Sequence, residues 1–99
     1  MSQDSNHYNQ YKKKLELSGI KPSKKLGQNF IFDKNILNNI TRLIDPSSCD
    51  LVVEIGPGLG GLSEALINNG VNKLLLIEKD KQFSYLLNEL KSKYPNQID

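Results

Sequence analysis

The amino-acid sequence predicts an α/β fold in which parallel strands alternate with helices, and three observations lead to this prediction. Two short aliphatic runs, residues 51–55 and 73–78, have the composition of buried strands. A glycine cluster at residues 56–61 directly follows the first run. Apolar residues at helical spacing follow both runs. The order strand, glycine loop, helix, strand, helix is one right-handed crossover unit of a doubly wound parallel sheet.

The N-terminal part of the chain has weaker patterns. Residues 1–7 are polar and predict a disordered start, and residues 8–17 predict a short basic helix. Residues 20–32 mix proline, glycine, lysine and apolar residues without a helical or strand period, which predicts a loop. We therefore expect a flexible basic extension over residues 1–20 and a domain over residues 21–99.

A first amphipathic helix is predicted after this loop. Asp33 is a suitable N-cap residue, and the helix should stop near Asp45, because the residue before Pro46 is disfavoured in helical conformation. The apolar face of this helix is expected to contain Ile36, Leu37, Ile40, Leu43 and Ile44.

The crossover unit follows. Its first strand, residues 51–55, is nearly all apolar and is expected to be buried on both faces. A helix should begin near Leu59 and end at Gly70, and Asp80 should cap the last helix, which Pro95 ends. The apolar face of that last helix is expected to contain Phe83, Leu86, Leu87, Leu90 and Tyr94. Because two strands are only part of a sheet, the pattern predicts a truncated domain.

Composition excludes several classes of protein. Hydrophobic residues are 37% of the 99 residues, which predicts a thin core. A single cysteine, Cys49, and a single histidine, His7, exclude an internal disulfide and a zinc site, so we expect no metal. The sequence has no signal peptide and no apolar run long enough to cross a membrane. These features predict a soluble, cytoplasmic protein without a membrane partner.

Basic residues are concentrated in the N-terminal half. The net charge is +2, but residues 1–50 hold eight Lys and Arg against five Asp and Glu. Six of these lysines lie between Lys12 and Lys25, with Glu16 as the one acid among them. Such a density favours contact with a polyanion such as RNA. A solvated surface face explains the charge equally well.

The glycine cluster predicts a binding site for a nucleotide-like ligand. A glycine-rich turn between a strand and a helix exposes backbone N–H groups and lets a ligand approach closely. Glu78 ends the next strand, 22 positions after Gly56, where it could accept hydrogen bonds from ribose hydroxyls. The alternatives are a loop that is only a tight turn and a Glu78 that is an ordinary exposed residue.

The glycines alone do not identify the ligand. Residues 56–61 satisfy both G-x-G-x-G and G-x-G-x-x-G, which fit S-adenosylmethionine and dinucleotides respectively. Three features favour S-adenosylmethionine: the charged Glu54 within the strand, Pro57 within the loop, and about fifty residues before the first strand. An NAD-binding oxidoreductase fragment remains an alternative.

Two segments resemble those of one enzyme family. Lys24 to Asp33, which reads K-K-L-G-Q-N-F-I-F-D, closely resembles the K-x-L-G-Q-N-F-L-x-D segment that opens bacterial rRNA adenine N6,N6-dimethyltransferases. Residues 53–62 resemble their V-E-I-G-P-G-L-G-x-L loop, and the resemblance covers residues 21 to about 94. Resistance-type 23S rRNA methylases share the Gln-Asn-Phe segment, but Pro57 and Leu59 favour the 16S-type enzymes.

This resemblance implies the N-terminal part of a Rossmann-like class I methyltransferase fold with S-adenosylmethionine as cofactor. It implies that Asn29 and Ile31 contact the cofactor, that Gly56 packs against its amino-acid part and that Glu78 binds its ribose. The full set of candidate cofactor residues is Gln28, Asn29, Ile31, Gly56, Gly58 and Glu78. Lys24 and Lys25 are candidate RNA contacts, whereas Phe30 and Phe32 are expected to pack in the core.

The family's catalytic loop does not occur in this sequence. That loop reads Asn-Leu-Pro-Tyr, and none of the four prolines lies in such a run, so we assign no catalytic residue. The third strand and the helical C-terminal domain are also expected to be missing. The implied partner is the rRNA of the small-subunit precursor, with a monomeric enzyme if complete, and these residues alone should bind cofactor weakly at most. Alternatives are a non-catalytic RNA-binding fragment that uses Lys12 to Lys25, or a 23S-type fragment.

Overall fold

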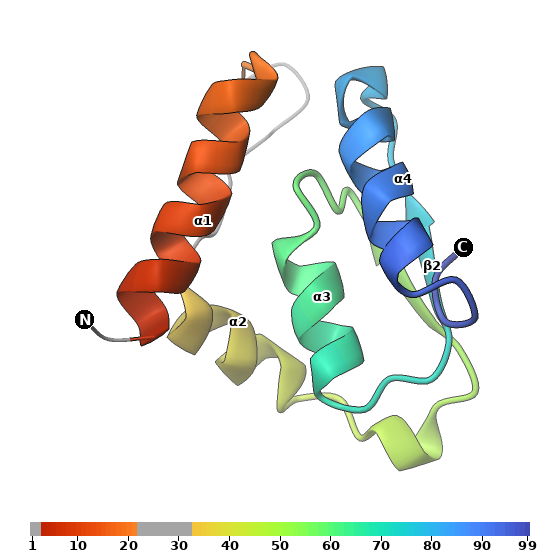
Figure 1. Cartoon of the computed structure of the whole chain (residues 1–99). Helices are drawn as coiled ribbons and strands as arrows, with labels where there is room; N and C mark the ends of the chain where they lie inside the picture. The colour runs from red at the N-terminus through yellow and green to blue at the C-terminus, as the bar shows by residue number, and fades with distance from the viewer. Residues whose placement is uncertain (1–2, 22–32) are drawn as a thin grey trace.

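The computed structural model describes residues 3–21 and 33–99 and has the alternating α/β architecture that the sequence predicts (Figure 1). The loop predicted over residues 20–32 lies almost entirely outside the described residues. The elements in chain order are α1 (Gln3–Ser18), α2 (Lys34–Thr41), the 3-10 helix η2 (Pro46–Ser48), β1 (Val52–Ile55), α3 (Gly61–Asn68), β2 (Leu74–Ile77), the 3-10 helix η3 (Lys81–Phe83) and α4 (Ser84–Lys93).

The two strands are parallel and in register from Val52 opposite Leu74 to Ile55 opposite Ile77. The other edge of β2 is also paired. Leu74 N donates to the carbonyl oxygen of Gln97 at 2.7 Å, and Asp99 N donates back to the carbonyl of Leu74 at 2.9 Å. Residues 97–99 thus form an isolated parallel bridge, with Ile98 opposite Leu74, and the sheet of the described residues has two strands, which agrees with the expectation that the third strand is missing.

One face of the sheet carries the core. Leu74 on β2 is buried with Leu66 of α3 and Leu90 of α4, so both crossover helices cover the same face of the sheet. On the other face, Val53 is 47% exposed and Ile55 is 80% exposed. The prediction that β1 is buried on both faces is therefore wrong for the described residues. Successive right-handed crossovers that move along a sheet in one direction place their helices on one side.

Helix α2 begins as predicted but ends early. The side chain of Asp33 accepts hydrogen bonds from the backbone N–H groups of Asn35 at 2.8 Å and Ile36 at 3.4 Å, which confirms the N-cap. The helix ends at Thr41, so Leu43 leaves the helical spacing and is 85% exposed. The expected apolar face is therefore only partly correct, since Leu37 is buried while Ile36 is 48% exposed.

Helix α1 is longer than predicted and packs onto the rest of the chain. It begins at Gln3, so residues 3–7 are helical where the sequence predicts disorder. Tyr11 and Ile20 are buried against Leu59 of the glycine loop and Phe83 of η3. Whether a domain boundary lies at residue 20 stays a prediction.

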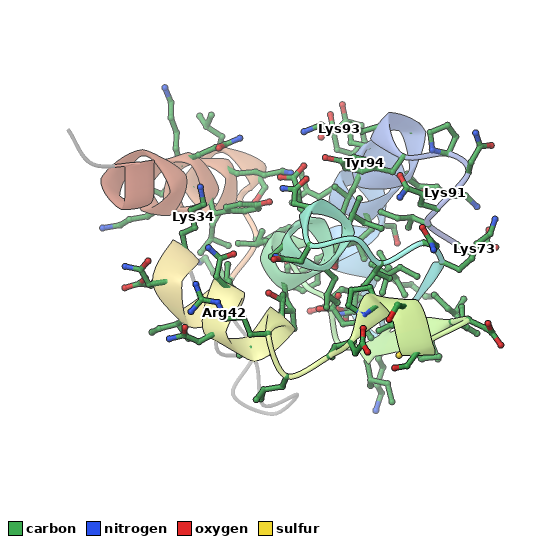
Figure 2. The ribbon with its side chains drawn as sticks, turned by 90° about the horizontal axis from the view of Figure 1, so that it is seen from below. Lys34, Arg42, Lys73, Lys91, Lys93 and Tyr94 are labelled. Atoms are coloured by element: carbon green, nitrogen blue, oxygen red, sulfur yellow. The ribbon has the colours of Figure 1, made fainter. Side chains whose placement is uncertain are left out.

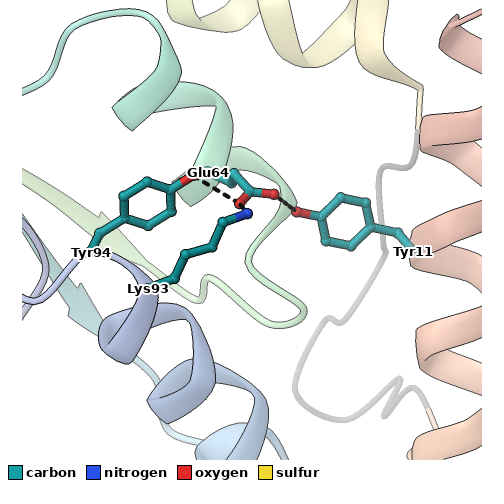
Figure 3. A network of polar contacts seen from close by, with 4 residues as sticks. All are labelled: Tyr11, Glu64, Lys93 and Tyr94. Carbon is teal, nitrogen blue, oxygen red and sulfur yellow. Dashed lines mark hydrogen bonds and ion pairs between the residues drawn. The ribbon is translucent and has the colours of Figure 1, made fainter.

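A carboxylate on α3 connects three helices (Figure 3). Glu64 accepts hydrogen bonds from Tyr11 Oη at 2.9 Å, Lys93 Nζ at 2.8 Å and Tyr94 Oη at 3.1 Å. Burial alone would raise the pKa of Glu64, but the hydrogen bonds from Lys93 and Tyr11, the lysine charge and the hydrogen bond from Tyr94 together hold this pKa below its ordinary value. Glu64 thus helps to fix α1 against α3 and the C-terminal end of α4.

The end of α3 before β2 and the start of η3 after β2 lie where the sequence predicts a helix end and a helix start. Gly70 has φ +100° and comes directly after the C-cap residue Asn69 of α3. The side chain of Asp80 accepts a hydrogen bond from Gln82 N at 3.0 Å and caps η3, which leads into α4. The predicted cap at Asp80 is therefore confirmed, although the first turn after it is a 3-10 helix.

Candidate cofactor site at the glycine loop

The glycine loop leads from the carboxyl end of β1 to the N-terminus of α3. Three of its glycines are left-handed, with φ +73° at Gly56, +55° at Gly58 and +86° at Gly60. Residues with side chains rarely adopt such angles. Gly60 N donates to the carbonyl oxygen of Pro57 at 2.9 Å, which closes a tight turn, and Gly60 is the N-cap of α3. The loop conformation therefore depends on glycine at several positions.

Gly56 and Gly60 face different surroundings. Among residues 3–21 and 33–99, a Cβ atom built at Gly56 would meet no other atom within 4 Å, whereas one at Gly60 would lie 2.9 Å from Leu90 Cδ2. Gly56 is also exposed. Gly60 is therefore required for packing against α4, and Gly56 leaves open space at the carboxyl edge of the sheet, where a ligand could approach the backbone.

Glu78 is bonded to the glycine loop. Its Oε1 accepts a hydrogen bond from Gly58 N at 2.8 Å, and its Oε2 accepts one from Asp80 N at 3.0 Å. A further backbone hydrogen bond from Gly56 N to the carbonyl of Ile77, 2.8 Å long, joins the two strand ends. The structure thus brings Gly56, Gly58 and Glu78 together. Each carboxylate oxygen of Glu78 keeps a lone pair that could accept a ligand hydroxyl.

A second acid, Glu54, lies beneath the loop and is 9% exposed. Its Oε1 accepts a hydrogen bond from Ser63 Oγ of α3 at 2.6 Å, and Ser63 is fully buried. Burial raises the pKa of Glu54, and the nearby negative charge of Glu78 raises it further. The hydrogen bond from Ser63 lowers this pKa but does not outweigh the effect of burial, so the pKa stays above its ordinary value. The sequence indicated Glu54 as an unusual charge in a strand, but nothing in it indicated that Ser63 would be the partner.

We expect Glu54→Gln to stabilise the chain at pH 7. The pKa of Glu54 is higher in the folded chain than in the unfolded chain, so protonated Glu54 favours folding. Its contribution to the free energy of unfolding is complete below the ordinary carboxyl pKa and is lost as the pH rises through the pKa of the folded chain. Glutamine can still accept the Ser63 hydrogen bond but carries no charge. The variant should therefore melt at a higher temperature than wild type at pH 7, and the difference should disappear toward pH 4, about the ordinary carboxyl pKa.

Thermal melts followed by circular dichroism at several pH values test this expectation. A variant that is less stable than wild type at pH 7 would show that the charge of Glu54 is compensated in the folded chain. Glu89→Gln, at an exposed position of α4, is the matched control for the loss of one carboxylate.

Five candidate residues from the sequence lie outside the described residues. They are Gln28, Asn29 and Ile31, which the resemblance assigns to the cofactor, and Lys24 and Lys25, which it assigns to RNA. Their roles remain predictions. Within residues 3–21 and 33–99, no group of three or more His, Cys, Asp or Glu residues could hold a metal ion. None of the helices in this same part of the chain is long and apolar enough to cross a membrane.

Comparison with known proteins connects this geometry to one family. The model of the ribosomal RNA adenine dimethylase family matches residues 19–98. Relatives named ribosomal RNA small subunit methyltransferase A include those of Agrobacterium fabrum, 35% identical over 86% of this chain and 31% of the relative, and Mycoplasmoides gallisepticum, 43% identical over 85% of this chain and 30% of the relative. A third, from Hydrogenobaculum, is 46% identical over 78% of this chain and 29% of the relative.

The chain spans about 30% of the length of these curated relatives. The matched region contains α2, both strands, the glycine loop and α4. This agrees with the resemblance that residues 24–33 and 53–62 indicate. The chain therefore belongs to the ribosomal RNA adenine dimethylase family.

Proposed function

We propose that this chain forms the first part of the cofactor site of an enzyme that uses S-adenosylmethionine to dimethylate adenine N6 in small-subunit rRNA. The observation that carries the proposal is the hydrogen bond between Gly58 N and Glu78 Oε1, beside the open space at Gly56. The names of the relatives support rRNA of the small subunit as substrate. In this proposal the enzyme is a cytoplasmic monomer.

The residues at the loop fit the shape and polarity of such a cofactor. Bound S-adenosylmethionine would supply an electrophilic methyl group. Gly56 has room for the amino-acid part of the cofactor, because no atom of the described residues lies near its missing side chain. Glu78 is held at the strand end by two backbone N–H groups and can accept hydrogen bonds from a ribose. These residues bind and orient the cofactor.

The remaining roles in the proposal come from the family resemblance. Asn29 and Ile31, with Gln28 beside them, would contact the cofactor from the N-terminal segment, and Lys24 and Lys25 would contact rRNA phosphates. We assign no residue of this chain to the methyl transfer itself. We therefore expect weak cofactor binding and no methylation of RNA by these 99 residues alone.

An NMR titration of the 15N-labelled chain tests the proposed ligand. S-adenosylmethionine should shift the amide signals of Gly56 and Gly58, and NAD should not. Glu78→Ala removes the acceptor at the strand end and should weaken binding about tenfold, since a hydrogen bond to a charged group contributes about 1.5 to 3 kcal/mol. Glu89→Ala, at an exposed position of α4, is the matched control.

The outcomes separate the competing ligands. Amide shifts caused by NAD and not by S-adenosylmethionine would favour an oxidoreductase site. Equal S-adenosylmethionine affinity in wild type and Glu78→Ala would exclude a ribose contact by Glu78. Gly56→Ala gives a second check, because its added methyl group meets no atom of the described residues but would occupy the proposed ligand volume. Its left-handed backbone at φ +73° costs about 1 kcal/mol, and Gly19→Ala, at φ +71°, is the control for this backbone cost.

A further inference from the structure

Helix α1 precedes residues 19–98, the segment that matches the family, and it packs on the glycine loop. Tyr11 of α1 and Ile20 just after the helix are buried in one cluster with Leu59, which lies within the loop. In Figure 1 the loop between β1 and α3 lies between α1 and α4. The N-terminal helix therefore supports the candidate cofactor site from one side.

The same cluster contacts both segments that hold Glu78. Gly58, whose N–H donates to Glu78 Oε1, directly precedes Leu59. Asp80, whose N–H donates to Glu78 Oε2, is the N-cap of η3, and Phe83 of η3 is fully buried in the cluster. A displacement of Leu59 or Phe83 would therefore move a donor to Glu78.

The glycine loop has few side chains of its own that could fix its shape. Four of residues 56–61 are glycine, the residue with the greatest backbone freedom. Leu59 is the largest side chain of the loop and is 5% exposed. Packing of the loop against the rest of the chain therefore depends strongly on the cluster around Leu59, to which Tyr11 belongs.

The hydroxyl group of Tyr11 connects α1 to the helix that follows the loop. Tyr11 Oη donates to Glu64 Oε1 at 2.9 Å, and Glu64 lies in the first turn of α3. Burial and the negative charge of Glu64 raise the pKa of Tyr11, so this hydroxyl keeps its proton at neutral pH. Figure 2 shows α3 between α1 on one side and Lys93 and Tyr94, at the C-terminal end of α4, on the other. Tyr11 is thus held at both its ring and its hydroxyl group.

We propose that Tyr11 is a positioning residue of the cofactor site, whose ring, through Leu59 and Phe83, holds the amide of Gly58 and the carboxylate of Glu78 in the arrangement that receives the ribose of the cofactor. The proposal rests on the proposed function, and it adds to the site a helix that lies before the matched segment. Tyr11 itself does not touch the cofactor. A site that is arranged in advance binds its ligand more tightly, because fewer groups become ordered on binding.

Hydrogen exchange of the Gly58 amide, followed by NMR of the 15N-labelled chain without ligand, tests this arrangement. The hydrogen bond to Glu78 should protect the amide in wild type. Tyr11→Ala should speed its exchange about fivefold or more relative to the amide of Leu74, which is bonded to Gln97 in the core. Tyr11→Phe keeps the ring and should restore this ratio to within about twofold of wild type.

Titration of the same variants with S-adenosylmethionine tests the consequence for binding. Tyr11→Ala should weaken binding about fivefold or more, whereas Tyr11→Phe should bind as wild type does, although it loses the hydrogen bond to Glu64. Val71→Ala is the matched control, because Val71 is 3% exposed and belongs to the other core cluster, beyond the C-terminal end of α3. It should lower the stability of the chain without changing the exchange ratio or the affinity.

Three results would overturn the role of Tyr11. These are an unchanged exchange ratio in Tyr11→Ala, an equal change in Val71→Ala, and a loss in Tyr11→Phe as large as that in Tyr11→Ala. If Tyr11→Ala does not fold, Tyr11→Leu, which keeps an apolar side chain, should show the same changes at about twofold, and their absence would count equally against the proposal.

Failure of the proposed function is seen separately. S-adenosylmethionine binding by wild type with unchanged affinity in Tyr11→Ala would overturn this inference alone. The expected exchange pattern, together with no binding of S-adenosylmethionine by wild type, would contradict the cofactor assignment alone, because the exchange measurement contains no ligand.

Discussion

Glu64→Ala is expected to lower the free energy of unfolding by about 3 kcal/mol, because it removes the acceptor of several hydrogen bonds at once. Tyr11, which is 4% exposed, and the half-buried Tyr94 would each lose the hydrogen bond to Glu64, so the desolvation of their hydroxyl groups would be compensated less well. Lys93 contributes less, because its side chain is 62% exposed and surface ion pairs are weak. The two tyrosines therefore account for most of the expected loss.

Urea unfolding followed by circular dichroism measures this loss, and a loss of about 3 kcal/mol corresponds to a fall in Tm of more than 10 °C for a chain of this size. Glu64→Gln should be milder, since its amide oxygen can still accept from Tyr11. Glu89→Ala serves as the exposed control. A midpoint for Glu64→Ala within error of wild type would show that α1 does not need this contact.

The pH dependence of the Glu64 variants has a definite sign. The pKa of Glu64 is below its ordinary value in the folded chain, so ionised Glu64 favours folding. Its contribution to the free energy of unfolding is complete above the ordinary carboxyl pKa and is lost as the pH falls through the pKa of the folded chain. The difference between wild type and Glu64→Gln should therefore shrink below about pH 4. This is opposite to Glu54, whose pKa is raised.

The order of elements and their main boundaries could be predicted because local sequence determines them. Asp33 and Asp80 are short polar residues before helical turns, and both accept the predicted backbone hydrogen bonds. Glu78 reaches the glycine loop because the carboxyl ends of neighbouring parallel strands meet at one edge of a sheet. These features depend on residues close in sequence or on a general property of parallel sheets.

Other features depend on packing between distant segments. Tyr11 and Glu64 are 53 residues apart, and a tyrosine in a polar helix has no pattern that indicates its partner. The exposure of Val53 and Ile55 depends on which side of the sheet each crossover helix occupies, which the composition of β1 does not reveal. Residues 97–99 are too short and polar to be recognised as a strand, yet they pair with β2.

Gly60→Ala is the second substitution with a large expected effect, a loss of about 2 kcal/mol in the free energy of unfolding. One part is the left-handed backbone at φ +86°, which costs a residue with a side chain about 1 kcal/mol. The other part is steric, since the new Cβ atom would lie 2.9 Å from Leu90 Cδ2, and Leu90 is buried in the core. The clashing atom is the end of the Leu90 side chain, so Leu90 must shift, and the steric cost depends on how far the surrounding core lets it move.

Gly19→Ala separates these two parts. Gly19 has φ +71°, and a Cβ atom there would meet no atom of the residues that the structure describes within 4 Å, so this variant should lose only the backbone cost of about 1 kcal/mol. Urea unfolding of both variants gives the difference, which measures packing against Leu90. If Gly60→Ala loses no more than Gly19→Ala, Leu90 relaxes freely and the loop tolerates a side chain at Gly60. A larger loss would show that α4 holds the glycine loop in shape, and with it the amide of Gly58 that meets Glu78.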